Sequence, residues 1–222
     1  MPDIGLFDVI GPWMVGPSSS HTAGACRMAS TALKIFGKEP EEVKFTLYGS
    51  FAETYRGHGS DKALLGGVMG FDTFDIRIRD SFELAEKRGL KYRFIEDHET
   101  KTAHPNTVRI ELIADGGESR LVTTAVSIGG GKIKIIRLDE VDVNFTGEFP
   151  TLILKHCNVP GVISYFTGIL SDYSVNISSM RCYAEPDGKT SYSIIESEQP
   201  IGSEIIKDIR SNKLILNSIL IQ

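Results

Sequence analysis

A cluster of hydroxyl and imidazole side chains stands near the amino terminus of this 222-residue chain. Its members are consecutive: Ser18, Ser19, Ser20, His21 and Thr22. Apolar residues follow at helical spacing, so we expect a helix to begin at about Thr22. Free N–H groups at a helix start, joined by hydroxyl donors, suit a carboxylate or phosphate. The segment therefore predicts a site for a small anion, and an over-endowed N-cap beside a surface histidine is the alternative.

Three further segments carry residues able to do chemistry. They are Gly57-His58-Gly59-Ser60-Asp61, His104-Pro105-Asn106 and Ser127-Ile128-Gly129-Gly130-Gly131. His58 and Asp61 stand three residues apart, which suits an acid–base pair and equally a helix start capped by Ser60. The His104 segment is typical of a turn before a strand. The triple glycine lacks the Lys-Ser/Thr ending of a phosphate loop and indicates positive φ or a close backbone approach.

Composition narrows the classes of function. The formal net charge of −5, with 24 basic and 29 acidic residues and no dense basic run, argues against a nucleic-acid partner. There is no run of 18 apolar residues and no secretory leader pattern, so we expect a cytoplasmic protein without a membrane partner. The cysteines Cys26, Cys157 and Cys182 fit neither a disulfide framework nor a Cys-x-x-Cys metal site. We expect no metal ligands in this chain and any cluster to come from another chain.

An acidic stretch over residues 138–150 separates two regions, and we expect domains at 1–145 and 148–222. The first should be a mixed α+β domain with helices against one sheet. Its expected helices begin at about residue 22, after residue 60 and at 82–88, and its expected strands cover 43–48, 74–78, 92–96, 107–114, 121–128 and 132–138. The last three strands should be antiparallel, because glycine-rich hairpin turns separate them.

The second region has the pattern of a ferredoxin-like βαββαβ domain. Its expected strands cover 151–155, 175–185, 190–196 and 214–221, and its helices 162–173 and 203–211. The segments His156–Ile163 and Ser174–Ile177 resemble an ACT domain, in particular the serine-binding ACT domain of phosphoglycerate dehydrogenases. That resemblance implies that His156, Asn158 and Asn176 bind L-serine across a domain–domain interface. An ACT copy that binds nothing is the alternative, with His156 and Asn158 serving the turn.

Taken together and in order, four motifs resemble the β chain of the iron–sulfur-dependent L-serine dehydratases. These are Gly16-Pro-Ser-Ser-Ser-His-Thr22, the Gly57–Asp61 segment, His104-Pro-Asn106 and the Ser127–Gly131 segment. The resemblance covers essentially the whole chain, because two-chain members end their β chain in an ACT domain. It implies a first domain like the allosteric substrate-binding domain of some phosphoglycerate dehydrogenases. It also implies a [4Fe–4S] cluster held by a separate α chain, with potassium as a further cofactor to consider.

The implied activity is that of a lyase that deaminates L-serine to pyruvate and ammonia, active only with the cluster-bearing partner. In the family, an iron of the cluster binds the substrate as a Lewis acid. A histidine near neutral pKa suits the removal of the α-proton. We take His58 and His21 as candidate bases and prefer His58, because Asp61 lies one turn away and could orient its ring if the segment is helical.

The sequence departs from many family members at two positions. Gly59 stands where a second histidine often occurs, and Ser60 stands where threonine is usual. If the base belongs at the position of Gly59, His21 becomes the stronger candidate. The residues expected to bind substrate are Ser18, Ser19, Ser20, Thr22, Ser60, His104 and Asn106. We further expect a homodimer formed through the ACT and N-terminal domains, in complex with the α chain.

Other functions stay open from the sequence. The chain could be a non-catalytic, L-serine-binding regulatory subunit, although a pure regulator has little reason to carry the first two motifs. A mononuclear metal enzyme could use His21, His58, Asp61 and His104, because His-x-x-Asp spacing is compatible with metal ligation. A Ser/His hydrolase is disfavoured, because no Gly-x-Ser-x-Gly elbow occurs and the adjacent Ser20 and His21 do not face each other.

Overall fold

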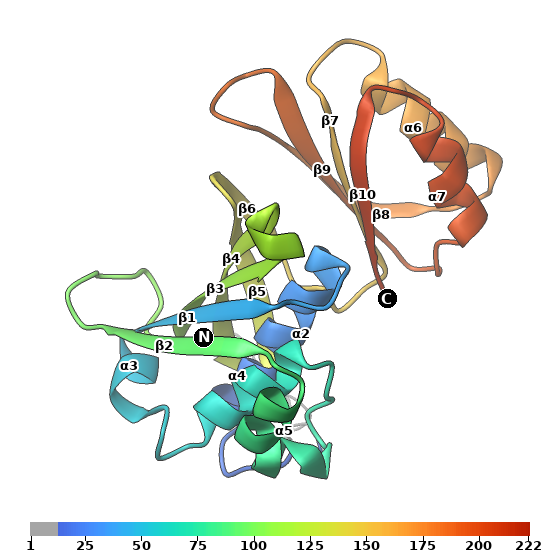
Figure 1. The fold of residues 1–222 in the computed structure, drawn as a ribbon. Coiled ribbons are helices and arrows are strands. Elements are labelled where there is room, and N and C mark those ends of the chain that lie inside the picture. The colour runs from blue at the N-terminus through green and yellow to red at the C-terminus, as the bar shows by residue number, and fades with distance from the viewer. Residues whose placement is uncertain (1–12) are drawn as a thin grey trace, which may run out of the picture. The chain divides into compact units, whose positions relative to one another are not determined.

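Two sheets, each with helices packed on it, give the chain an α+β fold, and the predicted class is confirmed (Figure 1). The structure is a computed structural model that describes residues 13–222. Contacts within the chain divide it into two units, residues 1–139 and 140–222. None of the helices in the described residues is long and apolar enough to cross a membrane.

The sheet of the first unit contains five of its strands in the order β2-β1-β3-β4-β5. Their bounds are β1 (Glu42–Tyr48), β2 (Lys91–Asp97), β3 (Thr107–Ala114), β4 (Ser119–Gly129) and β5 (Lys132–Leu138). Strands β1 and β2 pair in parallel, whereas β3, β4 and β5 form the predicted antiparallel run. Burial alternates along β1, and Val43, Phe45 and Leu47 are fully buried, as expected for a strand with one face on a core.

The helices of this unit begin with a π-helical turn, η1 (Ser19–Ala23), that continues into α2 (Gly24–Phe36). The others are α3 (Ser50–Thr54), α4 (Ser60–Val68) and α5 (Ser81–Lys87). Helix α2 packs on β3, β4 and β5 and also against α4. The two helices approach closely at Gly67, where an added Cβ would lie 2.4 Å from the carbonyl oxygen of Cys26. Glycine is therefore required there for packing and not for its φ.

One predicted strand is wrong. Residues 74–78 do not join the sheet, and Ile76–Asp80 form the 3₁₀ helix η2 instead. The Asp75 carboxylate caps this helix by accepting a hydrogen bond from the Arg77 N–H at 2.9 Å, and such local capping competes with strand pairing. The sequence also missed α3 and the strand β6 (Val141–Phe145), which lies inside the acidic stretch expected to separate the domains.

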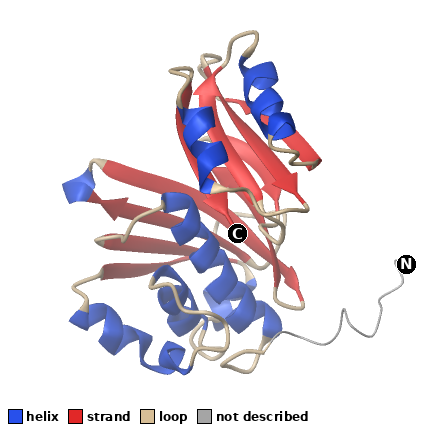
Figure 2. Ribbon diagram, turned by 90° about the vertical axis from the view of Figure 1, so that its right-hand side faces the viewer, coloured by secondary structure: helices blue, strands red, loops and turns tan. Residues whose placement is uncertain are grey.

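The second unit has the predicted order of elements. It consists of β7 (Thr151–Cys157), α6 (Val162–Asp172), β8 (Ile177–Ala184), β9 (Thr190–Ser197), α7 (Ser203–Arg210) and β10 (Ile215–Ile221), with β6 before them. Its four-stranded antiparallel sheet has the order β10-β7-β9-β8, which is the split βαβ arrangement of ferredoxin-like domains. Both helices cover the same face of that sheet (Figure 2). Leu152, Phe166, Ile195 and Ile205 form the core between them.

Candidate active site

The helix start at η1 uses its hydroxyl residues unequally. Ser18 is the N-cap, and its Oγ accepts a hydrogen bond from the His21 N–H at 3.0 Å. Thr22 is buried and its hydroxyl donates to the carbonyl oxygen of His58 at 3.0 Å. The half-buried hydroxyls of Ser19 and Ser20 make no hydrogen bond with other described residues. Capping therefore accounts for one serine and leaves two hydroxyls available to a ligand.

The structure brings the two candidate bases together. The imidazole rings of His21 and His58 have centroids 4.8 Å apart and are tilted by 31°. The ring of His21 also contacts the ring of Phe51 from α3, and these two ring centroids are 4.8 Å apart as well. Burial, together with the charge of His58, lowers the pKa of His21 below its ordinary value of 6.5. At neutral pH His21 is therefore an uncharged ring beside His58.

Helix α3 supplies a hydrogen-bond partner to each of these rings. Nδ1 of His58 lies 3.1 Å from the Thr54 carbonyl oxygen. Because a carbonyl only accepts, Nδ1 must carry the proton, which makes Nε2 the basic nitrogen of neutral His58. Nε2 of His21 lies 3.0 Å from the Ser50 hydroxyl, which can donate or accept. Thus the first and last residues of one short helix hold the two imidazoles.

The position of α3 is fixed by the His104-Pro105-Asn106 segment. The Ser50 N–H donates to the Pro105 carbonyl at 2.9 Å. At the preceding residue, Gly49, φ is +52° and an added Cβ would lie 2.6 Å from the same carbonyl oxygen. Sequence reasoning missed Ser50 and Thr54. The glycine and serine directly after a predicted strand were the signal that could have found them.

His104 and Asn106 themselves take part in the turn before β3. Nδ1 of His104 accepts a hydrogen bond from the Asn106 N–H at 3.1 Å, and the Asn106 carbonyl accepts from the Ser127 N–H at 2.9 Å. No contact among the described residues joins His104 to His21 or His58. The motif therefore contacts α3 through the Pro105 carbonyl and supports the histidine pair only indirectly. The role of His104 and Asn106 in substrate binding stays a prediction.

Asp61 does not orient His58 as the spacing suggested. His58 precedes α4, and Gly59 between them has a left-handed conformation with φ +66°, so the two residues do not share a helix. The Asp61 carboxylate instead accepts from the Lys62 N–H at 2.8 Å, and burial raises its pKa. The hydrogen bond expected from Asp61 is made by the Thr54 carbonyl.

A cavity of about 390 Å³ opens beside His58. Thr22, His58 and Asp61 line it, together with the segment Val15–Pro17. Three basic residues also line it: Arg56, Lys62 and Arg79. Arg56 also pairs with Glu96 at 3.4 Å. The basic residues make the cavity suitable for an anion, and His58 is one of the residues that line it.

Two buried hydroxyls lie close to this region without a partner among the described residues: those of Ser60 and Ser127. Ser60 is the first residue of α4, whose N-cap is Gly59, so the expected capping by Ser60 does not occur. Ser127 approaches α2 so closely that an added Cβ on Gly24 would lie 2.3 Å from its Oγ. Arg27 of α2 donates to the carbonyl of Gly131 at 2.9 Å. The glycine-rich segment is thereby held against the helix that carries His21.

No group of three or more His, Cys, Asp or Glu side chains in residues 13–222 is arranged to hold a metal ion. The four-ligand alternative with His21, His58, Asp61 and His104 therefore has no support in the described part of the chain. Cys26 is buried, and its thiol donates to the Phe71 carbonyl. Burial is the main cause that raises the pKa of Cys26 to about 12, so it is not a ready thiolate ligand.

Similarity to known proteins decides the family. The serine dehydratase beta chain family matches residues 6–92. A probable L-serine dehydratase beta chain of Bacillus subtilis is 41% identical over 205 residues, which cover 92% of this chain and 91% of that protein. The chain belongs to the serine dehydratase beta chain family. An L-serine dehydratase beta chain of Peptoniphilus asaccharolyticus is 45% identical over 82% of this β chain and 81% of its own length. An L-serine dehydratase of Streptomyces coelicolor is 30% identical over 58% of the β chain and 33% of that protein.

In the second unit of the β chain, the expected effector residues lie apart. His156 is buried; its Nδ1 donates to the Cys157 carbonyl and its Nε2 lies 2.8 Å from the Ser193 hydroxyl. Asn158 is exposed and donates to the Gly188 carbonyl in the turn after β8. Asn176 directly precedes β8. The two asparagines therefore lie at opposite ends of β8, about 26 Å apart at the usual rise of a strand.

Proposed function

We propose that this β chain forms half of the active site of an L-serine dehydratase, a lyase that converts L-serine to pyruvate and ammonia. The observation that carries the proposal is the hydrogen bond from Nδ1 of His58 to the Thr54 carbonyl. It leaves Nε2 as a lone-pair nitrogen, and His58 lines a cavity with basic residues. A ring nitrogen that is held in place beside an anion-binding cavity is what the removal of an α-proton from an amino acid requires.

In the proposed reaction, Nε2 of His58 takes the proton from C2 of serine. The electron pair of that C–H bond forms a C2=C3 double bond, and the hydroxyl leaves C3 with its bonding pair as hydroxide, which takes up a proton to become water. The aminoacrylate product tautomerises to an imine, which water hydrolyses to pyruvate and ammonia. His21 stays neutral beside the protonated His58, because burial and the neighbouring charge both lower its pKa.

The substrate carboxylate is proposed to lie in the cavity beside His58. Lys62 and Arg79 supply positive charge at the cavity wall. Ser19 and Ser20 do not line the cavity, but they belong to the same helix start as Thr22, which does, and their hydroxyls have no partner in the described residues. Ser18 and Thr22 contribute by shaping the helix start, because their side chains are already used within the chain. Together these groups would orient C2 of the substrate toward Nε2 of His58.

In residues 13–222 of the β chain, no group of three or more His, Cys, Asp or Glu side chains is arranged to hold a metal centre such as a [4Fe–4S] cluster. Cys26 is buried with its thiol bonded to a carbonyl, and it lies in a different unit from Cys157 and Cys182. We propose that the cluster belongs to an α chain and that its iron supplies a Lewis acid for the substrate hydroxyl. The relatives of Bacillus subtilis and Peptoniphilus asaccharolyticus are both named beta chains, which supports such a partner. Potassium as a further cofactor stays a prediction.

We also propose that residues 148–222 form an ACT module that senses L-serine in a homodimer. β8 is one of the two edge strands of its sheet, so a second copy could pair with it in antiparallel orientation. That pairing would bring Asn158 of one copy to Asn176 of the other, although they lie at opposite ends of β8 within one copy. Both nitrogens of His156 are engaged internally, so its proposed role is to hold the loop that carries Asn158.

The rival function is a regulatory subunit without catalysis. One experiment separates the two. The purified β chain alone should be colourless and release no pyruvate from L-serine, whereas anaerobic mixing with its α chain should give activity that His58→Ala or His21→Ala removes. Pyruvate from the lone chain, or full activity in both variants, would refute the proposal.

A further inference from the structure

Three apolar side chains of the first unit stand far out of the protein. Trp13 is 88% exposed, Ile76 is 64% exposed and Phe74 is 60% exposed. Among the described residues these are the three most exposed large apolar side chains. We call them the Trp13 patch. Large apolar side chains gathered on one surface are typical of a binding site for another protein, and Trp and Phe are frequent anchors in such sites.

The backbone joins the members of the Trp13 patch. The Val15 N–H donates to the Thr73 carbonyl at 2.7 Å, and the Thr73 hydroxyl donates to the Trp13 carbonyl at 2.8 Å. Trp13 therefore lies next to the segment that carries Phe74 and Ile76. Thr73 is buried between them, so the two segments form one surface and not two separate loops.

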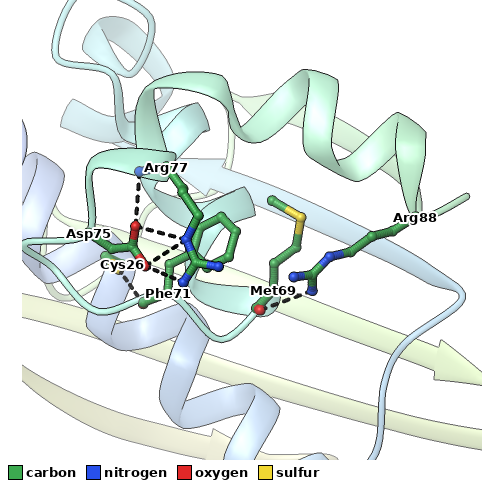
Figure 3. A network of polar contacts seen from close by, with 6 residues as sticks. All are labelled: Cys26, Met69, Phe71, Asp75, Arg77 and Arg88. Atoms are coloured by element: carbon green, nitrogen blue, oxygen red, sulfur yellow. Dashed lines mark hydrogen bonds and ion pairs between the residues drawn. The ribbon is translucent and has the colours of Figure 1, made fainter.

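A network of polar contacts holds the loop that displays Phe74 and Ile76 (Figure 3). At its start, the Cys26 thiol donates to the Phe71 carbonyl at 3.2 Å. At its end, Asp75 accepts from both the backbone and the side chain of Arg77, whose guanidinium also lies 4.3 Å from the centre of the Phe71 ring. Arg88 donates to the Met69 carbonyl at 3.1 Å just before the loop.

This loop is thus fixed in a conformation that leaves its apolar side chains in water. The network ties the loop to the buried residues Cys26, Met69 and Phe71, and it leaves Phe74 and Ile76 exposed. A rigid display has an advantage in association, because less conformational entropy is lost when the surface is covered. The geometry therefore indicates a surface prepared for a partner.

The Trp13 patch adjoins the cavity beside His58. Val15, which follows Trp13 closely, lines that cavity, and so do Ile78 and Arg79 from the same 3₁₀ helix as Ile76. The basic residues Lys62 and Arg79 stand at the cavity wall. A protein that covers the Trp13 patch would therefore also reach the cavity, and acidic groups beside its apolar surface would meet these cations.

We infer that the Trp13 patch is the docking surface for the α chain, which would present an apolar pocket with acidic groups at its edge. The inference rests on the proposed function, since it assumes that a second chain completes the site at His58. It identifies where that chain binds: on the loops Trp13–Val15 and Phe71–Arg79, so that it closes over the cavity. Trp13, Phe74 and Ile76 are its anchors.

The chain contains a single tryptophan, which allows a direct test. The full β chain labelled with 5-fluorotryptophan gives one ¹⁹F resonance, that of Trp13. Anaerobic titration with the purified, unlabelled α chain should shift this resonance in a saturable way. Phe74→Ser/Ile76→Ser should raise the Kd for the α chain by about 30-fold or more, as expected when two anchors are removed. Ile95→Ser, which changes a 39% exposed residue on β2, is the matched control and should leave the Kd unchanged.

Several results would overturn the inference: an unchanged Kd in the double variant, or no binding of the α chain. A ¹⁹F shift that depends on β-chain concentration without the α chain would assign the patch to a second copy. If removal of residues 1–12 shifts the Trp13 ¹⁹F resonance in the absence of the α chain, the Trp13 patch would be assigned to the chain's own amino terminus. If the α chain binds at Trp13 but no pyruvate forms, the docking surface is supported and the proposed function is contradicted. If pyruvate forms but the Kd of the double variant is unchanged, the proposed function is supported and the docking surface is contradicted.

Discussion

The Thr54 carbonyl oxygen accepts a hydrogen bond from Nδ1 of His58 at 3.1 Å, and this contact decides which nitrogen of the imidazole can act as a base. Ser50, at the other end of the same five-residue helix, contacts Nε2 of His21 at 3.0 Å. The geometry of the site therefore depends on α3 and on the Pro105 carbonyl that holds its first residue.

Ser50→Ala is expected to lower activity by loosening His21. The variant should reduce kcat of the complex with the α chain by about 10-fold, the lower end of the effect of a misplaced catalytic group. Ser50→Thr, which keeps the hydroxyl, should restore most of it. In the lone ¹⁵N-histidine-labelled chain, the Nε2 resonance of His21 should move in Ser50→Ala, because this nitrogen loses its hydrogen-bond partner. Identical imidazole spectra in the two proteins would remove Ser50 from this role.

His21 should make the stability of the protein sensitive to mild acid. Its pKa in the folded state lies below the ordinary value of 6.5, because of burial and the charge of His58. The unfolded chain therefore binds the proton first as the pH falls, and the unfolding free energy contributed by neutral His21 is present above about pH 6.5 and lost below it. Urea unfolding from pH 7.5 to 5 should show a smaller decrease for His21→Gln than for the wild type. Parallel curves would contradict this.

Two helical glycines offer a matched test of the packing. Gly67→Ala should destabilise the protein by about 1–3 kcal/mol, because the new Cβ would lie 2.4 Å from a backbone oxygen of α2. At Gly168 in α6, an added Cβ meets nothing within 4 Å. Gly168→Ala should therefore stabilise the chain by about 0.5–1 kcal/mol through helix propensity. Equal effects in urea unfolding would show that the α2–α4 contact is looser than described.

The proposed serine sensor can be tested on the full β chain. Calorimetry should detect L-serine binding, and Asn158→Ala and Asn176→Ala should each abolish it if one site uses an asparagine from each copy. Because each variant retains the other residue, a mixture of the two should recover one intact site in heterodimers. A chain that is folded and dimeric but gives no heat with L-serine would leave this module purely structural.

Much of the fold could be predicted because local patterns and tertiary structure agree. Residues 151–221 alternate cleanly between strand and helix periods, and each predicted element appears. Residues 74–78 failed because Phe74 and Ile76 alternate like a strand but face water, while Asp75 caps a 3₁₀ helix. Alternation of apolar residues predicts a buried strand only where another element of the protein packs on those residues.

The two histidines of the site could be predicted because each stands in a short cluster of polar side chains in the sequence. The structure brings the rings of His21 and His58 to a centroid distance of 4.8 Å. The groups that hold these rings are a backbone carbonyl at Thr54 and a hydroxyl at Ser50, which no pattern of residue types distinguishes. The expected Asp61 contact failed because Gly59 breaks the helical spacing with a positive φ.

The most direct measurement is the rate of pyruvate formation by the β chain with its α chain, compared between His58→Ala and His98→Ala. His98 is an exposed histidine that contacts Glu96 and lies outside the cavity beside His58, so it controls for the loss of an imidazole. We expect His58→Ala to lower kcat by about 100-fold or more, the usual contribution of a general base, and His98→Ala to leave it unchanged. A His58→Ala complex that assembles normally and turns over L-serine at the wild-type rate would contradict the account.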